Sequence, residues 1–599
     1  MRPYRDFLPD RRLWPLLGLS PDGAEVAYVD DATGQFNLAV RPVAGGAARQ
    51  VTAFTDQQVR GLAWHPDGRS LAVTADVDGD EQHQVFLVDA AGGEPRALTD
   101  NRQAQFNLGF GPPFSPDGRR LAYAGNDRTR TDQDVLVRDL HTGEVSRLVV
   151  DAGFTFPGFW SPDGTRLSAV QVRNQSDHEL YLVPLDGGQP RTVSPAEPEA
   201  SYLPGPWLPD GSGFVVCSNA GREFTGLARI DATTGELTWQ QTPEHEIDLV
   251  ARSADGRVLA WLVNVDGAAQ LRAQDLSTGA PINTPTLPAG VAAGIDVSSD
   301  GRWVALLLSR PTYPLNVVVV DLHTGELRPV TDAAPAGVDP SELIAPELVH
   351  YPSRDGRHVP AWLYRPRSSE PVGVVMALHG GPSAQERPGY RPLYQHLLHH
   401  GVAVLAPNVG GSTGYGKSYM KRVFRDWGGR DLDDFTDGAH WLRKQDWVDP
   451  ARIGLYGGSY GGFAVLSLVA RRPELDWVAA VDVCGISNLV TLARSSPPTW
   501  RSMVSAMIGD PDTDEEFLRS RSPVTYADQI RAPLFILQGA NDPRVPQHES
   551  DQIVEALRAR EVPVRYDVYP DEGHGFTKRH NQLQADTDSA EFLISHLAG

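Results

Sequence analysis

The sequence is poor in cysteine, in long apolar runs and in positive charge. Only two of the 599 residues are cysteines, Cys217 and Cys484, so we expect no disulfide and interpret both as small buried hydrophobic side chains. No segment approaches the roughly 18 to 20 consecutive apolar residues of a membrane helix, and the N-terminus lacks the apolar core of a secretory signal. We therefore expect a cytoplasmic protein without a membrane partner.

The shortage of basic residues excludes another class of partner. The chain has 54 lysines and arginines against 76 aspartates and glutamates, and the resulting net charge of -22 repels the phosphate backbone of nucleic acids. No group of histidine, cysteine and acidic residues has the spacing of a metal site, so we expect neither a metal nor a cofactor. The composition is typical of globular proteins, and the length requires at least two domains.

One phrase recurs seven times in the first half of the chain. In FSPDGRRLAYA, residues 114–124, a strand end is followed by an Asp-Gly turn and then by an alternating strand. A second strand pair with a Gly-containing turn follows each copy, which gives four strands per repeat. This pattern predicts a seven-bladed β-propeller. We interpret the repeated aspartates as turn residues rather than metal ligands: Asp22, Asp67, Asp117, Asp163, Asp210, Asp255 and Asp300.

The repeat stops after Thr331. The Ala/Pro-rich segment 332–349 has the composition of a domain linker, and apolar strands such as VGVVMAL and PLFIL then alternate with amphipathic helices. Near-continuous apolar strands between helices predict a parallel sheet that is covered on both faces. We therefore predict an all-β propeller with a short N-terminal arm in residues 1–335 and an α/β domain in residues 336–599.

The segment GGSYG, residues 457–461, matches the Gly-x-Ser-x-Gly pattern of a nucleophile elbow. It follows the strand-like RIGLY and precedes the helix-like GFAVLSLVARR, which is the strand–turn–helix context that the pattern requires. The elbow holds its serine in a strained turn where strand and helix backbones nearly collide, which explains the small residues on either side. The pattern predicts an α/β-hydrolase with Ser459 as nucleophile.

A serine nucleophile needs a histidine base and a carboxylate that orients the histidine. In α/β-hydrolases the chain order is Ser, Asp, His, and here Asp542 follows the strand PLFIL while His574 follows the strand VRYDVYP. Because the C-terminal ends of parallel strands share one edge of a sheet, we expect both side chains near Ser459. Asp551 and Asp571 are the alternative carboxylates.

Two backbone N–H groups are candidates for an oxyanion hole. One belongs to Tyr460, directly after the nucleophile, and the other to Gly381 in the loop HGGP, residues 379–382. The alternative interpretation of the HGGP loop is a plain Gly-Pro turn.

The motifs HGGP, PNVGGSTGYG, GGSYGG, GANDPRV and EGHGF follow the propeller in that order. With this propeller and this order of motifs, essentially the whole chain resembles the prolyl oligopeptidase family of serine peptidases, nearest its acylaminoacyl peptidase branch. The resemblance implies that Ser459, Asp542 and His574 form the catalytic triad. It also implies that Arg544 binds the substrate P2 carbonyl, where the alternative is a surface ion pair. Gly410 departs from the family, which usually has arginine there, so the role of that arginine is open.

The resemblance implies a peptidase that acts on short peptides, because the propeller covers the cleft, and it implies that copies of the chain can associate. We expect acylaminoacyl-peptidase or oligopeptidase activity. The segment from Ile486 to Met507, with Trp500 and Met503, would line the S1 pocket and favour an apolar P1 residue, although the same side chains could be core. The alternative is a dipeptidyl- or carboxypeptidase-type exopeptidase of the same family. The asparagine and glutamate pair typical of dipeptidyl peptidases are not recognisable.

Two other functions can be read from the same residues. GSTGYGKS, residues 411–418, satisfies the phosphate-loop expression, and VAAVD, ending at Asp482, imitates the acidic strand that accompanies it. However, Pro407 and two further residues separate the preceding strand from the loop, which argues against nucleotide binding. The remaining alternative is a propeller scaffold without catalysis.

Overall fold

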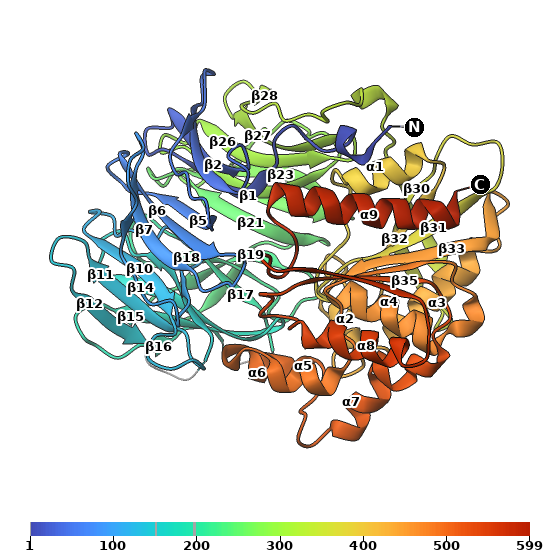
Figure 1. The fold of residues 1–599 in the computed structure, drawn as a ribbon. Coiled ribbons are helices and arrows are strands. Elements are labelled where there is room, and N and C mark those ends of the chain that lie inside the picture. The colour runs from blue at the N-terminus through green and yellow to red at the C-terminus, as the bar shows by residue number, and fades with distance from the viewer. Residues whose placement is uncertain (1, 150–152, 196–198, 599) are drawn as a thin grey trace.

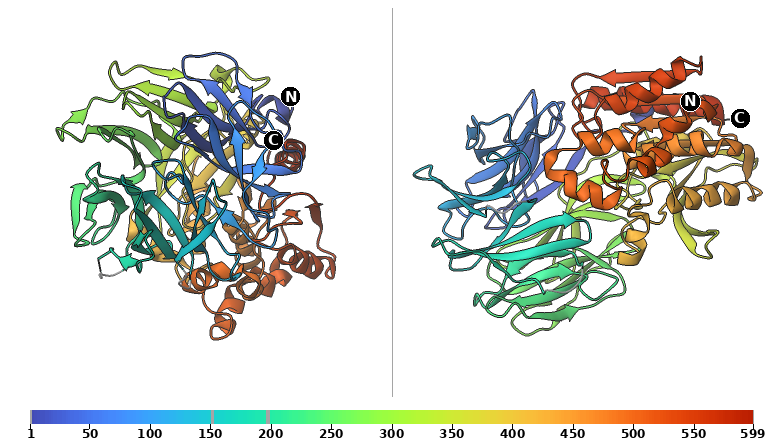
Figure 2. Two further views of the ribbon diagram at one scale, coloured as in Figure 1. Left: turned by 90° about the vertical axis from the view of Figure 1, so that its left-hand side faces the viewer. Right: turned by 90° about the horizontal axis from the view of Figure 1, so that it is seen from below.

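The computed structural model describes residues 2–149, 153–195 and 199–598. Within these residues, seven four-stranded antiparallel sheets are followed by one eight-stranded sheet (Figure 1). The predicted propeller and α/β-hydrolase architecture is therefore confirmed. The left view of Figure 2 shows the blades arranged around a common axis.

Each blade is built from four consecutive strands. Blades 1 and 2 comprise β1 (Leu13–Leu19), β2 (Glu25–Asp30), β3 (Asn37–Pro42), β4 (Arg49–Gln50), β5 (Gln57–Trp64), β6 (Ser70–Val77), β7 (Gln84–Asp89) and β8 (Arg96–Ala97). Blades 3 and 4 comprise β9 (Phe106–Asn107), β10 (Arg120–Gly125), β11 (Asp134–Asp139), β12 (Val145–Val149), β13 (Thr155–Trp160), β14 (Arg166–Asn174), β15 (Asp177–Pro184) and β16 (Arg191–Thr192). Blades 5, 6 and 7 comprise β17 (Tyr202–Trp207), β18 (Gly213–Ser218), β19 (Gly226–Asp231), β20 (Leu237–Gln241), β21 (Glu246–Arg252), β22 (Val258–Val265), β23 (Ala268–Asp275), β24 (Pro281–Ile282), β25 (Val291–Val297), β26 (Trp303–Arg310), β27 (Tyr313–Asp321) and β28 (Leu327–Pro329).

The repeated aspartates serve the turns between the first two strands of each blade. In blade 1 the Asp22 carboxylate accepts hydrogen bonds from the Ser20 hydroxyl (2.6 Å) and the Ala24 amide (3.0 Å). The Ser20 hydrogen bond lowers the pKa of Asp22, so the carboxylate is held ionised within its own turn. The same contact recurs between Asp163 and Ser161 (2.6 Å). These contacts agree with turn chemistry.

The ring of blades closes between the first and the last sheet. The Leu19 amide in blade 1 donates to the Asp296 carboxylate in blade 7 at 2.8 Å. The N-terminal arm crosses to the second domain, where the Tyr4 hydroxyl donates to the Asp586 carboxylate at 2.9 Å. The arm therefore adds a side-chain contact between the two domains to their covalent connection through the linker.

The second domain is a three-layer structure around the eight-stranded sheet. Its strand order is β29-β30-β32-β31-β33-β34-β35-β36, with parallel pairing from β32 to β36. The strands are β29 (Glu347–Pro352), β30 (His358–Tyr364), β31 (Val372–Leu378), β32 (Ala403–Pro407), β33 (Val448–Gly458), β34 (Ala480–Val483), β35 (Leu534–Gly539) and β36 (Val564–Tyr569).

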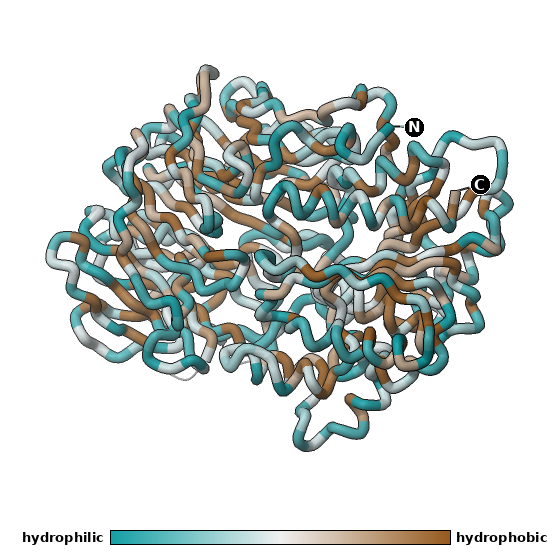
Figure 3. Tube along the Cα trace, viewed as in Figure 1, coloured by the Kyte–Doolittle hydropathy of each residue, from teal (hydrophilic) through white to brown (hydrophobic). Residues whose placement is uncertain are grey.

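Helices cover both faces of this sheet, as its apolar strands require. Helices α3, α4 and α8 pack on one face and α1 and α9 on the other (Figure 1), and the strands between them are mostly apolar (Figure 3). The helices are α1 (Pro392–His399), α2 (Lys417–Met420), α3 (Arg430–Leu442), α4 (Tyr460–Arg471), α5 (Leu489–Ser495), α6 (Arg501–Met507), α7 (Glu515–Arg521), α8 (His548–Arg558) and α9 (Arg579–Leu597). Short 3-10 turns are Tyr4–Asp6, Pro340–Glu342, Lys421–Val423, Pro473–Leu475, Pro498–Trp500 and Pro523–Gln529. The domain boundary between residues 335 and 336 stays a prediction.

Candidate active site

Four neighbouring strands of the parallel sheet end at the candidate active site. Ser459 directly follows β33, Cys484 directly follows β34, Asp542 lies three residues after β35 and His574 lies five residues after β36. Because these strands are adjacent and parallel, their C-terminal ends lie side by side at one edge. The Ser459 amide donates to the Val483 carbonyl at 2.9 Å, which holds the nucleophile candidate next to Cys484.

Ser459 has the strained backbone expected of a nucleophile elbow. Its φ of 58° and ψ of -122° are rarely adopted by residues other than glycine. The neighbouring glycines are required by close approach. A Cβ at Gly457 would lie 2.4 Å from the Gly461 carbonyl oxygen, and a Cβ at Gly461 would lie 2.1 Å from the Leu378 carbonyl oxygen. Any side chain at either position would therefore displace the elbow.

Asp542 and His574 are hydrogen-bonded to each other. The distance from His574 Nδ1 to Asp542 Oδ2 is 2.6 Å, and the other carboxylate oxygen accepts the amides of Arg544 (2.8 Å) and Val545 (2.9 Å). The Asp542 side chain is fully buried, whereas the His574 side chain is 15% exposed. With Nδ1 donating to Asp542, the Nε2 atom of a neutral imidazole is left as a proton acceptor.

The two alternative carboxylates are used elsewhere. Asp551 accepts the Tyr566 hydroxyl at 2.7 Å, and Asp571 forms an ion pair with Lys578 at 2.8 Å. These bonds leave Asp542 as the carboxylate that contacts His574 through a hydrogen bond.

The HGGP loop lies against the elbow. A Cβ at Gly380 would be 3.5 Å from Ser459 Cβ, so the following Gly381 amide lies in the immediate surroundings of the serine. On the other side, Phe463 N donates to the Ser459 carbonyl at 3.0 Å, so the Tyr460 amide precedes the first hydrogen bond that closes α4. The partial positive charge of a helix N-terminus adds to its capacity to hold an oxyanion.

Arg544 reaches across to the propeller. Its Nε donates to Glu81 Oε1 at 2.7 Å, and its guanidinium lies 5.6 Å from the Trp500 ring centroid. Glu81 has a φ of 56° and belongs to the loop between β6 and β7. Sequence reasoning did not single out Glu81, because nothing in its local pattern shows that blade 2 faces this loop of the hydrolase domain.

The predicted S1 residues differ in their exposure. Ile486 is only 3% exposed and packs in the core cluster that includes Tyr460 and Val545. Met503 is partly buried at the rim of that cluster, and its Sδ accepts a hydrogen bond from Gln175 of blade 4 at 3.5 Å. Met503, together with Trp500, is therefore nearer to the domain interface than Ile486 is.

A loop of blade 2 presses on both candidate catalytic loops. A Cβ at Gly79 would lie 2.5 Å from Gly573 N, next to His574. The Asp78 carbonyl accepts Asn541 Nδ2 at 3.3 Å, and its carboxylate pairs with Lys578 at 2.6 Å. The propeller thus contacts the segments that carry Asp542 and His574.

Arg422 occupies the space beside Gly410. A Cβ at Gly410 would lie 2.5 Å from Arg422 Nε, while Arg422 pairs with Asp355 at 2.7 Å. A side chain at position 410 would have to displace this buried guanidinium. Gly410, which departs from the family pattern, therefore has Arg422 of the 3-10 turn Lys421–Val423 packed against its backbone.

The phosphate-loop-like segment binds the propeller. The Lys417 amide donates to the Glu223 carbonyl at 2.9 Å, and the Ser418 amide and hydroxyl donate to the Glu223 carboxylate at 2.8 and 2.7 Å. Amides that would have to hold a phosphate are therefore already engaged. The nucleotide-binding alternative gains no support from this loop.

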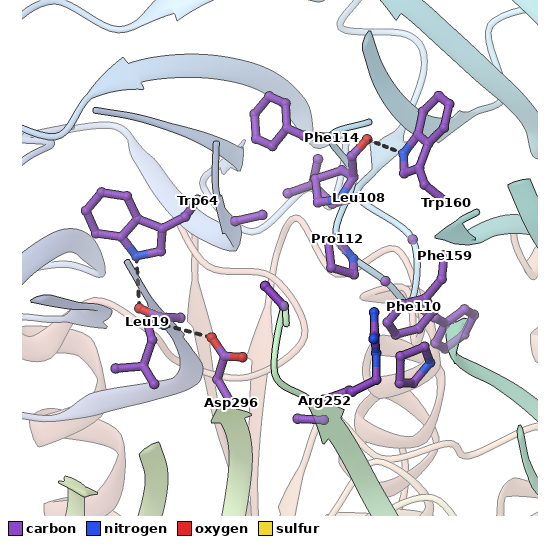
Figure 4. Close-up of a pocket in the computed structure, with 18 of the residues that line it drawn as sticks. Leu19, Trp64, Leu108, Phe110, Pro112, Phe114, Phe159, Trp160, Arg252 and Asp296 are labelled. Carbon is purple, nitrogen blue, oxygen red and sulfur yellow. Dashed lines mark hydrogen bonds between the residues drawn. The ribbon is translucent and has the colours of Figure 1, made fainter. Parts of the chain in front are cut away.

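A large cavity lies between the blades of the propeller, and none of the candidate catalytic residues lines it (Figure 4). It has a volume of about 1040 Å³, and its lining comes from residues 16–299. The lining includes the aromatic side chains of Trp64, Phe110 and Phe159, and Arg252 projects among them (Figure 4). The hydrolase domain contributes none of the lining residues in the described part of the chain.

The sequence interpretation of Cys484 as a small buried side chain agrees with its burial. The structure also places Cys484 at the candidate active site. Its sulfur, an Asp542 oxygen and a His574 nitrogen lie within 4.8 Å of one another. The one feature of the sequence that could have indicated Cys484 as a site residue is its place directly after the strand that forms β34.

Among residues 2–598 that are described, we find no helix with the length and apolarity needed to cross a membrane.

Comparisons with known proteins find related peptidases. The family model of the prolyl oligopeptidase family matches residues 389–599. The chain is 31% identical over 612 residues to dipeptidyl aminopeptidase BIII of Pseudoxanthomonas mexicana, covering 97% of this chain and 86% of that protein. It is 27% identical over 411 residues to the acylamino-acid-releasing enzyme of Rattus norvegicus, covering 66% of this chain and 50% of that protein.

Solved structures share the fold at low sequence identity. The crystal structure of puromycin hydrolase superposes with a TM-score of 0.84 at 23% identity, covering 98% of this chain and 94% of that one. The acylaminoacyl peptidase of Pyrococcus horikoshii superposes with a TM-score of 0.71 at 19% identity, covering 96% and 94%. The 31% identity to a curated peptidase over 97% of this chain, together with the family model, shows that the chain belongs to the prolyl oligopeptidase family of serine peptidases.

Proposed function

We propose that the protein hydrolyses short peptides by acyl-enzyme catalysis, as an acylaminoacyl-peptidase or oligopeptidase with an apolar P1 preference. The observation that carries the proposal is the 2.6 Å hydrogen bond between His574 and Asp542 at the same sheet edge as the strained Ser459. This arrangement supplies a base with a fixed orientation at the sheet edge that also carries the strained serine.

In the proposed mechanism, Ser459 Oγ attacks the scissile carbonyl and His574 Nε2 accepts the serine proton. Asp542 keeps the Nδ1 proton in place and stabilises the imidazolium that forms. The amides of Tyr460 and Gly381 stabilise the oxyanion of the tetrahedral intermediate. His574 then gives its proton to the leaving amine. In deacylation His574 accepts a proton from water, the water oxygen attacks the acyl carbonyl, and His574 returns the proton to Ser459 Oγ as the acyl group leaves.

Substrate binding uses the junction between the domains. Arg544 binds the P2 carbonyl, and Trp500 and Met503 form an apolar wall for the P1 side chain. The ion pair between Arg544 and Glu81 holds the guanidinium at the junction. Blade 2 and blade 4 both contact this junction, and we expect the propeller to admit an extended peptide and to exclude a folded protein.

The second candidate is a dipeptidyl aminopeptidase of the same family. It is favoured by the name of the relative that is 31% identical over 97% of this chain. It is also favoured by Glu81, because a carboxylate at the cleft can pair with the free amino group of a peptide. The two candidates differ in whether the substrate N-terminus is blocked or free.

A peptide library with matched free and acetylated N-termini separates these activities. The library is incubated with wild-type protein and with Ser459→Ala, and the products are identified by mass spectrometry. Release of acetylated single residues from blocked peptides supports the acylaminoacyl type, and release of dipeptides from free peptides supports the second candidate. Products that are equally abundant with Ser459→Ala would contradict both.

A further inference from the structure

Cys484 is the one side chain at the strand ends of the candidate active site that the proposed mechanism does not use. It directly follows β34, and its φ of 50° is unusual for a residue other than glycine. Its sulfur lies within 4.8 Å of ligand atoms of Asp542 and His574. Three adjacent strands, β34 to β36, therefore bring a sulfur, an oxygen and a nitrogen to one point.

These three donors suit one class of metal ion. Zinc and similar thiophilic divalent cations bind cysteine, histidine and carboxylate ligands, usually with tetrahedral geometry. Zinc bonds of about 2.0 to 2.3 Å keep neighbouring ligand atoms roughly 3.5 Å apart. The three ligand atoms, which lie within 4.8 Å of one another, are on the scale of that spacing. Magnesium, in contrast, prefers oxygen ligands and would not gain from the thiol.

The charges and protons of the complex balance. A thiol must give up its proton to bind a metal as thiolate, so Cys484 releases one proton to solvent when the metal binds. The His574 proton moves from Nδ1 to Nε2, which keeps the imidazole neutral. The thiolate and the Asp542 carboxylate then cancel both charges of the cation, so no net charge is buried.

We propose that Cys484, Asp542 and His574 form an inhibitory site for zinc, with water at the fourth position. Coordination of Nδ1 replaces its hydrogen bond to Asp542. It also leaves the proton on Nε2, so His574 can no longer accept the proton of Ser459. The inhibition depends on the proposed peptidase function, whereas metal binding itself does not.

Metal binding is tested directly with cobalt as a spectroscopic probe. Chelator-treated wild type, Cys484→Ala, Cys484→Ser and Cys217→Ser are titrated with Co²⁺, because a cobalt–thiolate bond absorbs in the near ultraviolet. Cys217 is the matched control, since it is also buried but lies in β18 of the propeller. Peptidase activity is measured in parallel titrations with Zn²⁺ and with Mg²⁺.

We expect the cobalt–thiolate band in wild type and in Cys217→Ser, with displacement by Zn²⁺, and no band in either Cys484 variant. Half-inhibition should need at least about tenfold more Zn²⁺ in the Cys484 variants than in wild type, each relative to its own uninhibited rate. A wild type without the band overturns the proposal even if the variants fold poorly. Equal zinc sensitivity of wild type and folded Cys484 variants overturns it as well. A band in a protein without peptidase activity supports the metal site and counts against the proposed function.

Discussion

At the scale of single residues, the candidate active site combines a strained serine with a firmly anchored carboxylate. Ser459 is held at a φ of 58° by glycines that pack without space for a side chain. Asp542 receives two backbone amides on one oxygen and His574 on the other. Both features orient reactive atoms before any substrate arrives, which is the basis of preorganised catalysis.

Asp542→Asn should remove activity while leaving the fold intact. The asparagine oxygen can keep the two amide bonds, but its NH₂ group cannot accept the His574 Nδ1 proton, so the imidazole adopts the wrong tautomer. We expect kcat to fall by about 10⁴-fold with an unchanged melting temperature, measured by steady-state kinetics and calorimetry. A loss of less than tenfold would contradict the assigned role.

Arg544→Ala should weaken substrate binding more than turnover. Loss of the guanidinium removes a hydrogen bond to the P2 carbonyl that is present before and during the reaction, so we expect KM to rise about tenfold with kcat nearly constant. Glu81→Gln is the matched variant, because it frees Arg544 from its ion pair and leaves the guanidinium in place. Equal KM values for Arg544→Ala and wild type would refute the P2 role.

Asp482 gives the protein a pH-dependent stability. The side chain is fully buried beside Gly462 and Gly485, and burial raises its pKa to about 8. The unfolded carboxyl ionises near about 4, so the stability of wild type falls relative to Asp482→Asn as the pH rises from about 4 to about 8 and changes no further above that. Melting temperatures at pH 5 and pH 8 should show a larger advantage of the variant at pH 8. An equal difference at both pH values would contradict the raised pKa.

At the scale of elements, the loop between β6 and β7 connects a propeller blade to the candidate catalytic loops. Gly79 has a φ of 75° and approaches the backbone of Gly573, and Asp78 pairs with Lys578. The loop therefore acts as a support for the segment that carries His574.

Gly79→Ala should reduce kcat by about tenfold or more, because a Cβ 2.5 Å from Gly573 N must push the His574 loop aside. Gly45→Ala is the control: its φ of 99° is also positive, but its Cβ would meet open space. The control should lose some stability from backbone strain and keep its activity per folded molecule. Parallel losses of kcat in both variants would show that the loop contact is unimportant.

The elements themselves could largely be predicted from local patterns. Asp-Gly turns between alternating strands recur in every blade, and apolar strands between amphipathic helices indicate a covered parallel sheet. The elbow was visible because its glycines are close in sequence. Glu81 and Cys484 were not visible as site residues, because their importance depends on which loops meet in space. Glu81 contacts a residue 463 positions away, and no periodicity encodes that distance.

At the scale of the whole molecule, the propeller is fastened to the hydrolase domain on several sides. Glu223 holds the loop at Ser418, Glu81 holds Arg544, and the N-terminal Tyr4 packs on α9. The right view of Figure 2, which looks from below, shows the two domains in contact along one side of the propeller. In the proposed function, substrate reaches the site through this junction, where contacts with the propeller restrict its size.

Cleavage should therefore depend on whether the substrate is folded. A reporter peptide should be cleaved when free, and the same sequence placed in a rigid loop of a folded protein should resist. A short, unfolded fragment of the carrier that contains the same sequence should be cleaved again. This control excludes an effect of the sequence itself. Rapid digestion of the native carrier, measured by mass spectrometry, would contradict a size-restricted cleft.

The central claim is that Ser459 is activated by the pair of His574 and Asp542. The most direct measurement is covalent labelling with a fluorophosphonate, followed by mass spectrometry of the modified peptide. The account predicts one label per chain, located on Ser459, with labelling abolished in Ser459→Ala and slowed strongly in His574→Ala. A well-folded wild-type protein that takes up no label, or a label on another residue, would contradict it.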